Sequence, residues 1–233
     1  VRNATTGYWN VGTYGLQATD VVNTTSGITG GVTISGNLNV TPKVLAVNAT
    51  KVYDGTRSFA GSVTGVGSET LNYSGLANSA NVANASHFSS MTLADGRNGG
   101  VASNYAFDNA STAAITRRPL TVSASKVYDG SNTIDVGAVT INFGAVGGNA
   151  NSGLVTGESL SVTAATGSDS HVSTADKYIS SLTLADASGL VGNYSIQGQS
   201  PAAGSALTGL SYAAGVNALT ITPRALTVSL TNT

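Results

Sequence analysis

The hexapeptide KVYDGT (residues 51–56) recurs almost unchanged as KVYDGS (residues 126–131). If the repeat marks chemistry, Asp54 and Asp129 are candidate acids or metal ligands. If it marks architecture, the hexapeptide is a turn signature in each copy of a repeated module. The rest of the chain favours the second interpretation.

Each copy contains a triplet that is typical of a tight turn. The triplets are Tyr53, Asp54 and Gly55, then Tyr128, Asp129 and Gly130. An aspartate side chain accepts nearby backbone N–H groups, and glycine adopts a positive φ without a Cβ penalty. We expect both tyrosine rings to cover a small core with their hydroxyls pointing outward. Calcium needs six to eight oxygen ligands, and no D-x-D-x-D-G run is present, so a metal site is not favoured.

The residues before the second hexapeptide alternate like a strand. Leu120, Val122 and Ala124 share one face, and the same alternation places Lys126 on that face. An unpaired lysine is rarely buried. We therefore expect the strand to end, or to bulge, at Ser125 and Lys126.

Further motifs recur in the same order, which predicts an internal repeat. The recurring pairs are VGSETL (66–71) and VTGESL (155–160), SSMTLAD (89–95) and SSLTLAD (180–186), Asn104-Tyr105 and Asn193-Tyr194, and ITRRPLTV (115–122) and ITPRALTV (221–228). KVYDG recurs after 75 residues (51 to 126) but the glutamates after 89 (69 to 158), so the second copy contains an insertion of 14 residues (89 − 75). Insertions of this kind are tolerated in surface loops.

The repeat suggests how the chain is divided. We interpret residues 1–41 as the tail of a preceding module, 42–117 as the first YDG module, 118–223 as the second with loop insertions, and 224–233 as the first strand of a following module. Three of the four prolines, Pro42, Pro119 and Pro223, lie at these junctions and keep the chain extended. No long Gly/Ser linker intervenes, so we expect an elongated, stiff rod.

The fold class expected from these patterns is mainly β. Short runs with a period of two and many β-branched residues predict half-buried antiparallel strands. Each small module is either an immunoglobulin-like sandwich or a β-grasp-like sheet. One short helix per module is compatible with the sequence, within residues 78–86 or at the corresponding place before Tyr178.

Composition excludes several classes of function. Charged residues make up 9% of the chain, against roughly 25% in ordinary globular proteins, and the net charge is −1. Such a chain has no field to attract nucleic acid, and no apolar stretch approaches the ~18 residues that a membrane-spanning helix needs. Cysteine is absent, which suits a chain exported unfolded through a pore because no disulfide can form midway.

The combination of motifs resembles the YDG/MBG-type repeats of large bacterial surface adhesins, many of them filamentous-haemagglutinin-like exoproteins exported by two-partner secretion. Residues 127–228 contain every element, including Ala175-Asp176-Lys177 and Gly192-Asn193-Tyr194. The first copy has Asn84-Ala85-Ser86 and Ser103 at the corresponding places. The resemblance implies a stalk module of a secreted or surface-attached protein, with an outer-membrane transporter as its partner during export and with no known active site.

Other candidate sites are weak. Glu69 and Glu158 are the only glutamates, one in each copy, whereas a glycosidase needs two carboxylates across one cleft. We expect each to be hydrogen-bonded locally. His87 and His171 do not align between the copies, which argues against a metal site. We therefore expect no cofactor and no catalysis, and the alternative function is a carbohydrate-binding module that recognises matrix polysaccharide or host glycans.

Overall fold

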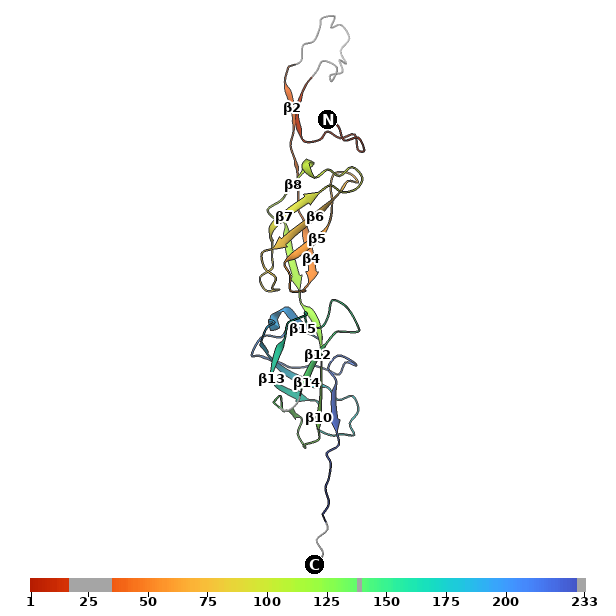
Figure 1. The fold of residues 1–233 in the computed structure, drawn as a ribbon, viewed down its shortest axis with the longest axis vertical. Coiled ribbons are helices and arrows are strands. Elements are labelled where there is room, and N and C mark those ends of the chain that lie inside the picture. The colour runs from red at the N-terminus through yellow and green to blue at the C-terminus, as the bar shows by residue number, and fades with distance from the viewer. Residues whose placement is uncertain (17–34, 138–139, 230–233) are drawn as a thin grey trace, which may run out of the picture. The chain divides into compact units, whose positions relative to one another are not determined.

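The computed structural model describes residues 1–16, 35–137 and 140–229, and nearly all of its regular structure is β-strand (Figure 1). The mainly β fold predicted from the alternating apolar residues is therefore confirmed. Parts of the predicted tail (17–34) and of the predicted following strand (230–233) lie outside the described residues. Residues 224–229 form no strand, and the side chains of Leu226 and Val228 are exposed.

The chain is organised in two units. Unit 1 consists of Val1–Ala49, Ser58–Ala77 and His87–Ala113, and unit 2 consists of Thr50–Arg57, Asn78–Ser86 and Ala114–Thr233. Two stretches of the first sequence repeat, 50–57 and 78–86, thus belong to unit 2. The boundaries predicted at 41, 117 and 223 follow the sequence repeat and stay a prediction for the modules.

Unit 1 is built from short strands. Its largest sheet is antiparallel, in the order β5 (Ser58–Thr64), β6 (Thr70–Ala77) and β7 (Phe88–Ala94). The other pairs are β1 (Gly12–Gly15) with β2 (Asn37–Val40), antiparallel, and β3 (Lys43–Leu45) with β8 (Tyr105–Phe107), parallel. Strands β4 (Asn48–Val52) and β9 (Thr112–Thr116) pair with each other, and each is divided between the two units, after Ala49 and after Ala113. Leu45, Leu71 and Tyr105 form the centre of the core of unit 1.

Unit 2 contains two four-stranded sheets. The long strand β10 (Arg118–Val127) pairs with β12 (Ile141–Gly144), β15 (Tyr194–Ile196) and β17 (Leu219–Thr222). The second sheet has the order β11 (Thr133–Ile134), β13 (Leu160–Gly167), β14 (Ile179–Asp186) and β16 (Ala206–Leu207). The fully buried apolar residues come from both sheets and include Leu120, Val122, Ile179, Leu182, Leu184, Tyr194 and Ile196.

The expectation of antiparallel strands is confirmed for pairs such as β5–β6 and β13–β14, but it is wrong for two neighbours of β10. Strand β10 is antiparallel to β12 but parallel to both β15 and β17. Parallel neighbours require a long crossover, and here the chain forms most of the second sheet between β10 and β17. Alternation of apolar residues shows which face of a strand is buried, but it carries no information on the direction of the neighbouring strand.

One parallel pairing recurs with the same register in both units. Lys43 lies opposite Tyr105 in unit 1, and Arg118 lies opposite Tyr194 in unit 2. In each case the tyrosine directly follows a three-residue 3-10 turn that ends at asparagine, Ala102–Asn104 or Val191–Asn193. The sequence repeat therefore corresponds to a repeated local structure.

The short α-helix considered for residues 78–86 is not formed. The Asn78 amide oxygen accepts the Ser86 N–H at 3.0 Å, and the Asn78 amide group donates to the Asn84 carbonyl at 2.8 Å. Asn and Ser side chains compete with helical hydrogen bonds in this way, so the segment is a loop with a turn. In the described part of the chain the only helical elements are the two 3-10 turns, and no helix there is long and apolar enough to cross a membrane.

Strand β10 ends near the predicted place, but Lys126 lies within it and is buried. Strand β10 continues to Val127, and Lys126 is only 5% exposed. Its ammonium group donates to the carbonyls of Ser131 at 2.9 Å and Thr133 at 2.7 Å, and it pairs with Asp129 at 2.9 Å. Burial is tolerated because all three donors of the ammonium group are used.

Candidate functional site

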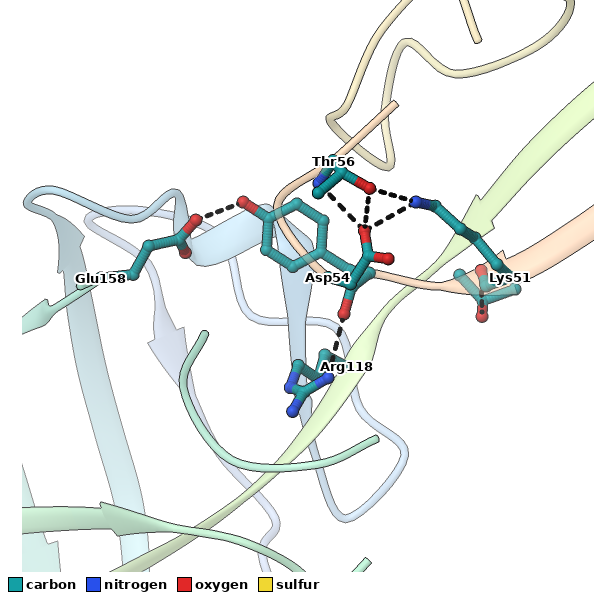
Figure 2. Close-up of polar contacts among 7 residues, drawn as sticks. Lys51, Asp54, Thr56, Arg118 and Glu158 are labelled. Atoms are coloured by element: carbon teal, nitrogen blue, oxygen red, sulfur yellow. Dashed lines mark hydrogen bonds and ion pairs between the residues drawn. The ribbon is translucent and has the colours of Figure 1, made fainter. Parts of the chain in front are cut away.

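The first Tyr-Asp-Gly turn is closed by hydrogen bonds within the hexapeptide (Figure 2). Asp54 Oδ1 accepts the backbone N–H and the hydroxyl of Thr56, both at 2.9 Å, and the Lys51 ammonium group at 2.7 Å. Burial alone would raise the pKa of Asp54, but the hydrogen bonds from Lys51 and Thr56 outweigh it and lower this pKa. Gly55 has φ 79°, the left-handed conformation expected from the sequence.

The second turn has the same local geometry. Asp129 Oδ1 accepts the Ser131 N–H at 2.9 Å, and Gly130 has φ 80°. The hydrogen bond from Lys126 lowers the pKa of Asp129. Both aspartates therefore accept a backbone N–H group of the turn, as the architectural interpretation predicts. Each also pairs with a lysine, which that interpretation did not predict.

Tyr53 does not point its hydroxyl into solvent, so that expectation is wrong for the first copy. The side chain is 4% exposed, and its hydroxyl donates to Glu158 Oε1 at 2.5 Å (Figure 2). The expectation that Glu158 is hydrogen-bonded locally is wrong as well, because its partner lies 105 residues away in sequence.

A second tyrosine completes the site around the same carboxylate. Tyr194, which is fully buried, donates to Glu158 Oε2 at 2.5 Å and accepts the Val155 N–H at 3.1 Å. The rings of Tyr53 and Tyr194 meet edge to face, with centroids 5.6 Å apart, a favourable arrangement for aromatic pairs. Burial and the hydrogen bond to Glu158 raise the pKa of Tyr53 to about 12, and the same two causes raise the pKa of Tyr194.

Asn193 fixes a second segment beside this carboxylate. Its side chain is 2% exposed, accepts the Val82 N–H at 2.9 Å and donates to Asn81 Oδ1 at 3.1 Å. Glu158, Tyr194 and Asn193 are called the Glu–Tyr–Asn cluster of unit 2. It holds two stretches of the first repeat, the turn that contains Tyr53 and the loop that contains Val82.

Arg118 supports the same region from the start of β10. Its guanidinium group donates to four backbone carbonyls: Tyr53 at 3.3 Å, Ala150 at 2.7 Å, Ser152 at 2.9 Å and Gly153 at 2.8 Å. The planar group thereby ties the first turn and the loop inserted in the second copy to one strand.

Unit 1 contains a corresponding cluster of Glu69, Tyr105 and Asn104. The Tyr105 hydroxyl donates to Glu69 Oε2 and accepts the Val66 N–H at 2.8 Å. Glu69 is 3% exposed. Burial and the hydrogen bond to Glu69 raise the pKa of Tyr105. The acceptor role of the tyrosine oxygen repeats that of Tyr194.

The asparagine of unit 1 also binds a neighbouring stretch of chain. Asn104 accepts the Val11 N–H at 2.8 Å and donates to Asn10 Oδ1 at 2.9 Å. In both clusters, therefore, the asparagine side chain binds an Asn-Val dipeptide.

Glu69 and Tyr8 line a cavity of about 190 Å³ in unit 1.

The geometry favours a structural role for these groups over acid–base chemistry. Both oxygens of Glu158 accept hydrogen bonds from phenolic hydroxyls. His171 is bound to Asp169 on the surface, and among the described residues no three His, Cys, Asp or Glu side chains gather as metal ligands. The sequence indicated the shared register of Glu and Asn-Tyr in the two copies, but not that these residues meet.

No curated protein and no solved structure matches this chain. A YDG domain is detected at residues 116–203, the stretch that contains the second Tyr-Asp-Gly turn and the Glu–Tyr–Asn cluster of unit 2.

Proposed function

We propose that this chain is a non-enzymatic structural repeat region of a secreted bacterial surface adhesin, and that it serves adhesion or biofilm cohesion by extending the protein from the cell. The YDG match at residues 116–203 supports the repeat identity. The resemblance of the motif series to adhesin repeats supports the surface location and export through an outer-membrane transporter.

The observation that carries the proposal is how the repeated polar side chains are used. Tyr53, Glu158 and Tyr194 direct their polar atoms at each other, and Asn193 directs its amide at backbone and side-chain groups of another segment. An enzyme keeps reactive groups open to substrate. Here the groups that recur in sequence hold segments of chain together.

Tandem modules in a rod follow from the same interpretation. The register of Lys43 with Tyr105 repeats in that of Arg118 with Tyr194. Strand β10 begins at Arg118, the last residue of the ITRR segment, and only Arg117 separates it from the end of β9. Stiff junctions would keep successive modules in line and hold the tip of an adhesin away from the cell surface.

Small-angle X-ray scattering tests this proposal. A compact globule of 233 residues has a radius of gyration of about 17 Å, and the proposal predicts a clearly larger value and an elongated distance distribution. A control with a Gly/Ser linker inserted between residues 117 and 118 should broaden that distribution. A radius near that of the globule would contradict the stalk role.

The second candidate is a glycan-binding module, which one feature of unit 1 favours. The cavity beside Glu69 is lined by Trp9, Tyr8, Asn104 and Tyr105 among others, and an apolar pocket with a few convergent polar groups is typical of small-ligand sites. Glycan-array binding that is lost with Trp9→Ala would support this function. The matched control is Tyr212→Ala, which removes an exposed aromatic residue of unit 2.

A further inference from the structure

The two hexapeptides have the same internal structure but different surroundings. In each, lysine pairs with the aspartate three residues later, at 2.7 Å for Lys51 and 2.9 Å for Lys126. The glycines share their φ to within a degree, 79° for Gly55 and 80° for Gly130. A difference in environment therefore cannot be traced to a difference in the turn itself.

The tyrosine of the first turn is buried, and the tyrosine of the second turn is not. Tyr53 is 4% exposed and bound to Glu158, whereas Tyr128 is 37% exposed and its hydroxyl has no hydrogen-bond partner among the described residues. A Cβ at Gly55 would lie 3.2 Å from Val155 Cγ1, but a Cβ at Gly130 would meet nothing within 4 Å. The Tyr128 side chain and the space beside Gly130 are therefore accessible.

The loop that accompanies the first turn also has a counterpart. In the first copy the Asn81 N–H binds Ser79 Oγ at 3.0 Å, and the following Val82 N–H is taken by the Asn193 amide. In the second copy the His171 N–H binds Asp169 Oδ1 at 2.7 Å. By this equivalence Val172, which is 37% exposed, takes the place of Val82.

The second turn and its loop lie next to each other. The Gly167 N–H donates to the Asn132 carbonyl at 2.7 Å, and Thr133 pairs with Thr166 in the sheet. These contacts join the two residues that follow the KVYDGS segment to the start of the loop that contains Val172. Tyr128 and Val172 are taken together because their counterparts Tyr53 and Val82 are both bound by neighbouring residues of unit 2, Glu158 and Asn193.

We propose that Tyr128 and Val172 form a docking surface for the Glu–Tyr–Asn cluster of a further YDG repeat in the same chain. The partner is identified by its chemistry: a carboxylate that accepts the Tyr128 hydroxyl, and an asparagine amide that accepts the Val172 N–H. Tyr53 and Val82 are already bound by such a pair, Glu158 and Asn193. The inference rests on the proposed series of repeats and names the contact that joins them.

The hydrogen bonds made by the asparagine are found in both units. Asn104 and Asn193 both bind a valine N–H and the amide oxygen of the preceding asparagine. In the second copy His171 takes the place of Asn81. On docking, the Val172 N–H therefore still binds the asparagine amide oxygen, whereas the side-chain hydrogen bond made by Asn81 in the first copy is replaced by a contact with histidine. Tyrosine and valine are thus the constant parts of the docking surface.

The test compares the present chain with an extended one, made by joining residues 118–233 directly after Pro223. This junction follows the alignment of ITRR with ITPR, so the appended copy offers a Glu–Tyr–Asn cluster to Tyr128. Tyr128→Phe should leave hydrogen exchange unchanged in the present chain. In the extended chain it should raise exchange in the appended cluster by about 10-fold or more, which corresponds to ~1.4 kcal/mol.

The same measurement contains its controls. Tyr53→Phe should raise exchange around Glu158 in both proteins, and changing the appended copy of that glutamate to glutamine should reproduce the effect of Tyr128→Phe. If Tyr128→Phe leaves hydrogen exchange of the extended chain unchanged while Tyr53→Phe raises it, the inference is wrong. Concentration-dependent dimers of the present chain that Tyr128→Phe abolishes would also overturn it, in favour of docking between separate chains.

A failed docking test leaves the proposed stalk function standing, because elongation is measured independently by scattering. Conversely, a compact shape with a positive docking test would remove the stalk role and keep the contact. The two proposals can therefore fail separately.

Discussion

Replacing Tyr53 with phenylalanine isolates one contact of the cluster. The change keeps the ring, and with it the edge-to-face contact with Tyr194, but removes the hydroxyl that donates to Glu158 at 2.5 Å. No cavity forms, since only one oxygen atom is lost. The perturbation is therefore a hydrogen bond to a carboxylate and little else.

The magnitude follows from the environment of the two partners. Hydrogen bonds to charged groups contribute about 1.5–3 kcal/mol to stability. Glu158 keeps its bond to Tyr194 and is only partly buried, so water can reach the oxygen that loses its donor. We expect a loss of about 1.5–2 kcal/mol for Tyr53→Phe, at the lower end of that range.

Hydrogen exchange with mass spectrometry is the suitable assay because it resolves the two units. A loss of this size raises exchange rates about 10- to 30-fold in segments 50–57, 78–86 and 153–160. Strands β6 and β7 of unit 1 serve as an internal reference. Tyr128→Phe is the matched control, since the same hexapeptide loses the same atom where it makes no contact.

Equal exchange profiles for Tyr53→Phe and Tyr128→Phe would refute the cluster as a source of stability. A double-mutant cycle strengthens the test. Tyr53→Phe combined with Glu158→Gln should cost less than the sum of the single changes, because both remove the same contact. If the two losses of stability simply add, Tyr53 and Glu158 have no coupling energy and the 2.5 Å contact does not contribute to stability.

Three further predictions concern pH, backbone conformation and the guanidinium group. The pKa of Tyr53 is raised from 10.0 in the free side chain to about 12. The contribution of its hydroxyl to stability is therefore complete below pH 10 and is lost as the pH rises toward 12. Between these pH values the melting temperature of Tyr53→Phe should depend less on pH than that of the unchanged chain. Gly130→Val should cost about 1–3 kcal/mol in thermal melts because φ is 80°, whereas Gly192→Ala, with no Cβ contact within 4 Å and no positive φ, should cost little. Arg118→Lys cannot reproduce four carbonyl contacts and should speed proteolysis of the loop at residues 145–153; an unchanged cleavage rate would contradict its supporting role.

The features that the sequence predicts well are those set by neighbouring residues. Positive φ at Gly55 and Gly130 follows from the Asp-Gly dipeptide, where a short carboxylate and a missing Cβ favour the same turn. The mainly β fold follows from alternation that needs only a buried face, as Leu120 and Val122 on β10 illustrate. Both inferences use information contained within a few residues of chain.

The features that it misses depend on distant partners. Lys126 is buried because carbonyls of the turn that follows saturate its ammonium group, and alternation alone gave no sign of that compensation. The tyrosine–glutamate contact joins Tyr53 to a residue 105 positions away. Its one signal in sequence was the shared register of tyrosine, glutamate and asparagine in both copies, which shows that residues recur together but not that they touch.

The departures of the first copy from the repeat motif follow the same division. Ser103 occupies the position of Gly192, where φ is ordinary and the space beside the Cα is open, so this glycine is not required.

The Ala-Asp-Lys segment is also replaceable, because its lysine closes a loop that other residues can close. Lys177 donates to the carbonyls of Val172 and Thr174, while in the first copy the Asn78 side chain binds Asn84 and Ser86 instead. Different side chains thus hold the same loop in each copy. The glutamate, tyrosine and asparagine of each cluster are the same in both copies, and in unit 2 they bind segments from another part of the chain. Variation between the copies is therefore found in the residues that close a loop locally, whereas the glutamate, tyrosine and asparagine of the clusters are the same in both copies.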